Sequence, residues 1–120
     1  MDKRCIHTPK SPFDGLDCRL DNTTGALGTA ADSDIAAKVR TKLGRLLFGV
    51  QSKIHAARQS TVTKKRTKLL RTVTKKINAA LGTIAKAQNN GKVSDSLADQ
   101  LILALNQALA AAQNPGLQTP

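Results

Sequence analysis

The most regularly spaced chemical groups in this chain are cationic. Lysines and arginines recur at intervals of three and four residues, which places them on one face of a helix. Such a row of ammonium and guanidinium groups can bind phosphate, sulfate or carboxylate groups. We predict an anion-binding ridge centred on Lys64, Lys68, Arg71 and Lys75 and flanked by Lys38, Lys42 and Arg45.

A long block without acidic residues surrounds this ridge. The 120-residue chain has 19 Lys or Arg and only eight acidic residues, all of them Asp. The block from Ile35 to Ser94 contains fifteen basic residues and no acidic one. A solvated helix face explains the spacing, but solubility alone favours mixed charge. The expected partner is therefore an anionic polymer or surface, either a polysaccharide or nucleic acid, and base readout is not expected because Phe13 and Phe48 are the only aromatic rings.

The two cysteines, Cys5 and Cys18, enclose a short loop. In an oxidising environment they would form a disulfide, and in a reducing one they would remain free thiols. A zinc site that also used His7 and His55 would lack the closely spaced Cys and His pairs that are typical of such sites. We predict the Cys5–Cys18 disulfide and no metal site.

The remaining candidates for catalysis have simpler interpretations. Cys5 lies in a segment without periodicity, where a nucleophile would be poorly oriented. Asp32 and Asp34 are placed to cap a helix, and Gly91-Lys92 is too short for a phosphate-binding loop. We therefore expect a protein that is not an enzyme and that uses no cofactor.

The elements that carry these residues are all predicted to be helices. The fold class is all-α, a three-helix bundle with a short additional N-terminal helix, and its core consists of Leu, Ile, Val and Ala. An extended arm covers residues 1–11, and residues 12–114 form the bundle. The short helix spans 12–22, the three main helices span 34–58, 61–89 and 94–114, and residues 115–120 form a tail.

Capping and breaking residues set these boundaries. Gly25 and Gly28 indicate a loop after the short helix, and the cluster at 32–34 indicates the start of the next one. The apolar pattern is interrupted at 58–61, which favours two helices over one long rod. Gly91 is typical of a left-handed helix stop, and Ser94 is typical of an N-cap.

The predicted helix 94–114 is apolar on most of its surface. Ile102, Leu103 and Leu109 extend its apolar side well beyond the main stripe. A helix of this kind is either central in its bundle or part of a contact with another chain. Both remain open, and the contact would be with a second copy or with a parent protein.

Two segments resemble a known group of domains. Phe13-Asp14-Gly15-Leu16-Asp17-Cys18-Arg19-Leu20-Asp21 and Asn90-Gly91-Lys92-Val93-Ser94-Asp95-Ser96-Leu97-Ala98-Asp99 are similar to stretches of small Lys-rich helical domains near the C-termini of large secreted bacterial proteins. The resemblance implies an appended, non-catalytic helical hairpin or bundle outside the cytoplasm. It implies no activity, so no functional residue is carried over.

The expected function is therefore a non-enzymatic accessory domain of a secreted bacterial protein, which attaches to an anionic surface or polymer. Its expected location is extracellular or at the cell surface, although no apolar segment follows Met1-Asp2-Lys3-Arg4 as in a signal peptide. No apolar run is long enough to span a membrane. The alternatives are a cytoplasmic, sequence-independent nucleic-acid-binding protein and a structural spacer or assembly module.

Overall fold

Four helices make up the part of the chain that the structure describes. The computed structural model describes residues 12–113, of which helices cover 84%. The helices are α1 (Pro12–Thr29), α2 (Ala37–Gln59), α3 (Thr63–Asn89) and α4 (Asp95–Ala112). Over this range the only β-type pairing is an isolated bridge between Ile35 and Val93. The all-α prediction is confirmed, but the number of full-length helices is four instead of three.

The prediction of a short N-terminal helix over 12–22 is wrong, because α1 continues to Thr29 and has as many residues as α4. Leu16 and Leu20 are fully buried, and the same helix face continues through Thr23 and Leu27, which are buried as well. Gly25 and Gly28, which we interpreted as a loop, lie on the exposed side of the helix. Burial of Leu27 and Ala26 outweighs the cost of about 1 kcal/mol for each helical glycine.

The start of α2 also differs from the prediction. The helix begins at Ala37, three residues after the expected start at 34, and its N-cap Ala36 makes no side-chain cap. Asp32 and Asp34 lie in the preceding turn, where Asp34 N–H donates to the Ala31 carbonyl. The predicted break between the second and third helices is confirmed, with α2 ending at Gln59 and α3 beginning at Thr63.

The connection between α3 and α4 agrees with the sequence prediction. Gly91 adopts a φ of 72°, in the left-handed region. The Gly91 amide donates to Gln88 O at 3.1 Å and the Lys92 amide donates to Ala87 O at 2.8 Å, the pattern of a Schellman stop. Ser94 then caps α4, since its hydroxyl accepts a hydrogen bond from the Leu97 amide at 3.2 Å.

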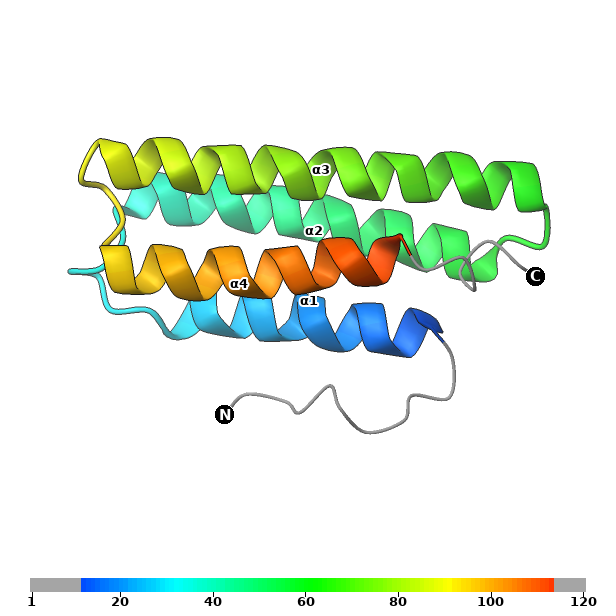
Figure 1. Ribbon diagram of the computed structural model, residues 1–120, viewed down its shortest axis with the longest axis horizontal. Helices are drawn as coiled ribbons and strands as arrows, with labels where there is room; N and C mark the ends of the chain where they lie inside the picture. The colour runs from blue at the N-terminus through cyan, green and yellow to red at the C-terminus, as the bar shows by residue number, and fades with distance from the viewer. Residues whose placement is uncertain (1–11, 114–120) are drawn as a thin grey trace.

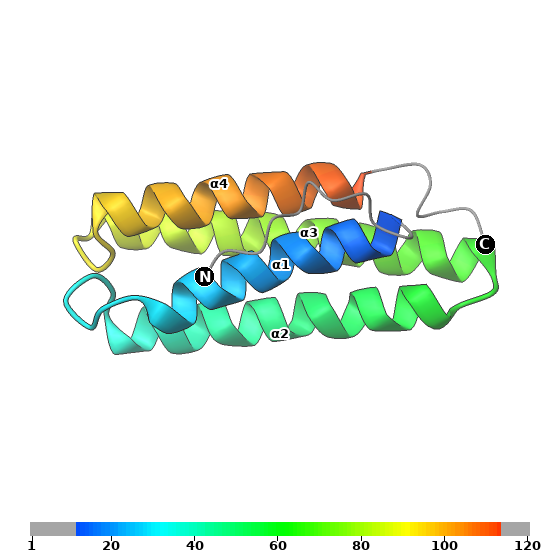
Figure 2. The same cartoon turned by 90° about the horizontal axis from the view of Figure 1, so that it is seen from below.

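The helices lie side by side and alternate in direction along the chain (Figure 1). Successive helices α1 to α4 pack against one another, and α4 also packs against α1 (Figures 1 and 2). The α1–α2 and α3–α4 connections meet at the same end, where Ala36 N–H donates to Lys92 O and Ser94 N–H donates to Asp34 O, each at 2.8 Å. This pairing holds the α3–α4 connection against the start of α2.

One aliphatic core runs between the four helices. Its largest fully buried side chains come from every helix: Leu16, Leu20, Leu43, Leu47, Val50, Ile54, Val73, Ile77, Ile84, Leu101 and Leu105. On α3 the core includes Leu70, whereas Val62, the residue before this helix, is exposed. On α4, Ile102 and Leu109 pack against the core and Leu103 is 62% exposed. Most of the additional apolar surface of this helix is therefore used within the bundle.

Candidate anion-binding face

Three arginines of the acid-free block form hydrogen bonds with oxygen atoms of other segments of the protein. Arg66 is only 8% exposed and lies at the α2–α3 connection. Its Nε donates to the Ala57 carbonyl at 3.1 Å and its Nη2 donates to the Ser60 carbonyl at 2.7 Å. These carbonyls lie at and just beyond the end of α2, where the helix itself supplies no donors. Arg66 therefore has a structural role.

Arg58 and Arg40 join helix α2 to preceding parts of the chain. Arg58 donates to a carboxylate oxygen of Asp17 on α1 at 2.9 Å. Arg40 donates to the Ala30 carbonyl and lies 3.6 Å from an Asp32 carboxylate oxygen. Acidic residues from outside the block thus bind two of its cations.

The other twelve cations of the block have no ion pair with any acid in residues 12–113. Ten are exposed, and Lys53 and Lys76 are half-buried. Except for Lys92, which lies in the α3–α4 connection, all are on α2 or α3. The set, which we call the basic face, is Lys38, Lys42, Arg45, Lys53, Lys64, Lys65, Lys68, Arg71, Lys75, Lys76, Lys86 and Lys92.

The centre of the predicted ridge forms an exposed line on α3. Lys64, Lys68, Arg71 and Lys75 are all exposed, whereas Val73 and Ile77 on the opposite side of the helix are buried. At 1.5 Å per residue the line is about 17 Å long. It can contact several successive charges of an extended anion.

The predicted flanking residues occupy a different part of the molecule. Because α2 and α3 are antiparallel, the start of α2 lies beside the end of α3 (Figure 1). Lys38 and Lys42 therefore share a cleft with Lys86 and Lys92, and they do not flank the Lys64–Lys75 line. Arg45 lies one turn further along the same side of α2.

Lys86 and Lys92 were missing from the predicted site. Lys86 continues the helical spacing of the ridge, but the ten residues between Lys75 and Lys86 place no basic side chain on that face. Lys92 follows the helix stop and has no periodic signal at all. Only the pairing between the two end connections brings Lys92 to the start of α2.

The acidic side chains that the structure describes are on other elements. Asp17 and Asp21 are on α1, Asp32 and Asp34 are in the α1–α2 turn, and Asp95 and Asp99 are in the first turns of α4. Asp95 accepts a hydrogen bond from the Gln88 amide at 2.9 Å. The α2–α3 hairpin thus carries unpaired positive charge, and the acids lie on α1, on α4 and in the connection before α2.

Cys18 is disulfide-bonded. Its predicted partner, Cys5, and His7 lie outside the described residues, so the Cys5–Cys18 pairing stays a prediction. His55 is exposed on α2. Between Pro12 and Gln113 no group of three or more His, Cys, Asp or Glu side chains is close enough to hold a metal ion.

The basic face therefore consists mainly of exposed cations on a helical hairpin. No helix in the described part of the chain is both long and apolar enough to cross a bilayer.

Comparison with protein-family models, curated proteins and solved structures finds no match to this chain.

Proposed function

We propose that this protein is a non-enzymatic helical domain that binds an anionic polymer or surface through its α2–α3 hairpin. The observation that carries the proposal is the segregation of charge: the twelve cations of the basic face have no ion pair with an acid of the described residues. An attached polyanion would supply the missing negative charge. Binding would also release the counterions condensed on the polymer, which favours association at low salt.

The shape of the face supports an extended partner. The unpaired cations of α3 run from Lys64 to Lys86, about 33 Å along the helix axis at 1.5 Å per residue. Base stacking would have few side chains to use, because the chain has no Tyr or Trp and Phe48 is its exposed phenylalanine on α2. We therefore propose recognition by charge density. The resemblance to secreted bacterial domains favours an acidic polysaccharide or the cell surface as the partner.

The direct test is a binding titration against an acidic polysaccharide and against duplex DNA at several salt concentrations. The Lys64→Gln, Lys68→Gln, Lys75→Gln triple variant should bind both polymers more weakly than wild type. For DNA, the slope of log affinity against log salt should become shallower by up to about 3, since each lost phosphate contact removes about 0.9. Circular dichroism should show an unchanged helical fold because these side chains are exposed.

A matched control changes the net charge equally on another helix. The Gln100→Glu, Asn106→Asp, Gln107→Glu triple variant alters exposed positions of α4 and also lowers the net charge by three. It should retain most of the affinity. An equal loss in both variants would contradict the proposed face. Tighter binding to DNA than to the polysaccharide would favour the nucleic-acid alternative, and no binding to either polymer at low salt would leave the spacer or assembly module.

A further inference from the structure

A cleft of about 430 Å³ lies between the first turns of α2 and the last turns of α3. Val39 and Ala87, both buried, form part of its apolar lining, and Thr83 and Asn90 add polar groups. Clefts of this volume hold small molecules. It is also the place where the structure gathers lysines from two helices and a connection.

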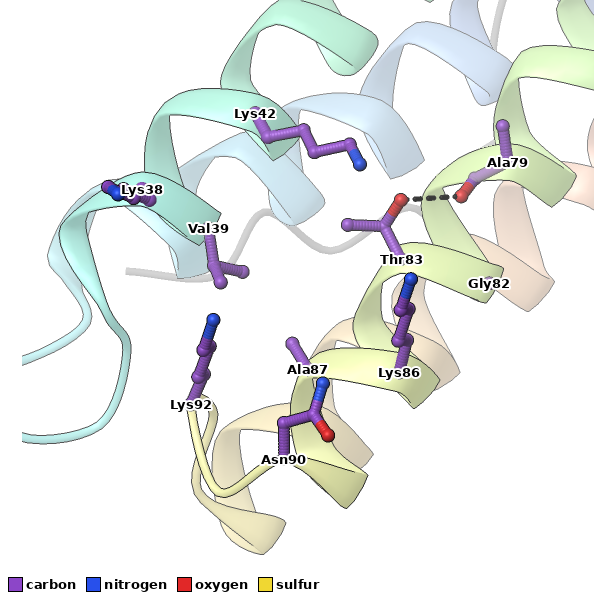
Figure 3. Close-up of a pocket in the computed structure, with 10 residues that line it drawn as sticks. All are labelled: Lys38, Val39, Lys42, Ala79, Gly82, Thr83, Lys86, Ala87, Asn90 and Lys92. Atoms are coloured by element: carbon purple, nitrogen blue, oxygen red, sulfur yellow. Dashed lines mark hydrogen bonds between the residues drawn. The ribbon is translucent and has the colours of Figure 1, made fainter.

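Four lysines and no acidic residue line this cleft. Lys42 extends from α2 toward Thr83, Lys86 extends along α3 toward the same threonine, and Lys92 extends from the α3–α4 connection toward Val39 (Figure 3). Lys38, also on α2, lines the cleft from that helix. The ammonium groups of these lysines repel one another because they line the same cleft. An anion bound among them would reduce this repulsion.

The backbone fixes the lysine that comes from the connection. Gly91 and Lys92 complete the Schellman stop of α3, and the Lys92 carbonyl accepts a hydrogen bond from Ala36 N–H at 2.8 Å. Its neighbour Val93 is buried and forms the bridge with Ile35. The backbone of Lys92 is therefore held in place by hydrogen bonds, which lowers the entropy cost of binding a ligand.

The donors indicate the class of ligand. Lysine binds phosphate groups as a compact point charge, and the four cations that line the cleft are all lysines. Val39 and Ala87 would exclude water from the side of a ligand that contacts them. The hydroxyl of Thr83 donates to the Ala79 carbonyl at 3.0 Å, which leaves the lysines and the Asn90 amide as donors to the ligand.

The geometry points to a binding site for a small molecule that carries a diphosphate group or a phosphate monoester. The four lysines of the cleft belong to the basic face, but the cleft is separate from the Lys64–Lys75 line. The inference goes beyond the proposed function because it assigns a compact ligand to this end of the face in place of a polymer. At least two negative charges on the ligand would face the three lysines that extend over the cleft.

The test is an NMR titration of the whole, ¹⁵N-labelled protein with inorganic pyrophosphate at constant ionic strength. We expect saturable shift changes that are largest at Thr83, Ala87, Asn90 and Lys92. The Lys42→Gln, Lys86→Gln, Lys92→Gln variant should weaken pyrophosphate binding by at least about ten-fold, as expected from three modest charge contacts. The Lys64→Gln, Lys68→Gln, Lys75→Gln variant loses the same charge and should weaken it less than about two-fold.

A second pair of variants leaves the charge unchanged. Thr83→Leu fills the cleft between the helices, and Thr72→Leu places the same side chain three turns earlier on the same side of α3. Both hydroxyls only bond back to their own helix, to Ala79 and Lys68 respectively, so both variants should fold. Thr83→Leu should weaken pyrophosphate binding and Thr72→Leu should not.

The proposal is overturned if the two lysine triples weaken pyrophosphate binding equally, if the two leucine variants behave alike, or if shifts spread over all lysines without saturation. These outcomes concern pyrophosphate alone. The proposed polymer-binding function is tested by a different experiment, and it fails if the wild-type protein binds neither polysaccharide nor DNA.

Discussion

Arginine and lysine have different roles in this protein although they alternate in the same sequence block. Arg40, Arg58 and Arg66 donate to backbone carbonyls or carboxylates of other segments. The planar guanidinium can donate to two acceptors at once, which suits the carbonyls near a helix end. All the lysines of the block belong to the basic face, with Arg45 and Arg71. A count of basic residues therefore overstates the number available to a partner.

The guanidinium group of Arg66 provides a test of this difference between arginine and lysine. Replacing Arg66 by Lys keeps the charge but removes the fork that serves Ala57 and Ser60. Leaving one of these carbonyls without its donor should lower the free energy of unfolding by about 1–3 kcal/mol. Urea unfolding followed by circular dichroism measures the loss. The control, Arg71→Lys, alters an exposed arginine of the same helix and should change stability by less than about 0.5 kcal/mol.

At the scale of elements, the helices are stabilised mainly by what they bury. Helix α1 contains three glycines, at 15, 25 and 28, and α2 and α3 begin without a side-chain cap. Of these three helices and α4, the starts of α2, α3 and α4 are described, and among them α4 alone begins with the capping serine that its sequence predicts. Buried leucines, isoleucines and valines on one side of each helix compensate for these unfavourable local features.

Two glycines with opposite backbone requirements test this view. Gly25 lies within α1 and a methyl group there would meet no atom within 4 Å, so Gly25→Ala should raise the free energy of unfolding by about 0.5–1 kcal/mol. If residues 25–28 formed the loop that the sequence suggests, the substitution would give no such gain. Thermal and urea unfolding measure the change.

Gly91 provides the opposite control. Its φ of 72° strains any residue with a Cβ atom, although the space around it is open. Gly91→Ala should therefore lower the free energy of unfolding by about 1–2 kcal/mol. A gain in stability from this substitution would contradict the Schellman geometry that positions Lys92.

For the whole molecule, the important feature is the separation of charge between elements. The chain carries a formal net charge of +11. Within residues 12–113, the twelve cations of the basic face lie on the α2–α3 hairpin and the connection that follows it. Like charges on neighbouring helices repel one another in the folded state, and salt screens this repulsion within about 10 Å at 0.1 M. Folding thus tolerates an electrostatic cost that a bound polyanion would remove.

This cost predicts that salt stabilises the protein. Raising sodium chloride from about 0.01 M to about 0.2 M should increase the free energy of unfolding, since the Debye length falls from about 30 Å to below 10 Å. Urea, which is uncharged, is the appropriate denaturant. The Lys64→Gln, Lys68→Gln, Lys75→Gln variant should show a smaller dependence on salt. A loss of stability with added salt would instead mean that the Arg58–Asp17 and Arg40–Asp32 pairs dominate.

The amino-acid sequence was enough to predict the all-α class, three of the four helices to within about three residues and the break between α2 and α3. It also predicted the glycine stop at Gly91 and the cap at Ser94. These features depend on side-chain periodicity and on backbone preferences that act over a few residues. The exposed line Lys64–Lys75 follows from the same periodicity, because a helix that buries one side must expose the other.

Three features could not be predicted without the packed structure: the full length of α1, the partners of the three arginines and the cleft that joins Lys42 with Lys86 and Lys92. Each depends on contacts between residues far apart in the chain. Burial of Leu27 against the other helices outweighs the local preference of Gly25 and Gly28 for a turn. Antiparallel packing of α2 on α3 and the Ile35–Val93 bridge bring the lysines together, and helical spacing alone carries no information about which helix ends meet.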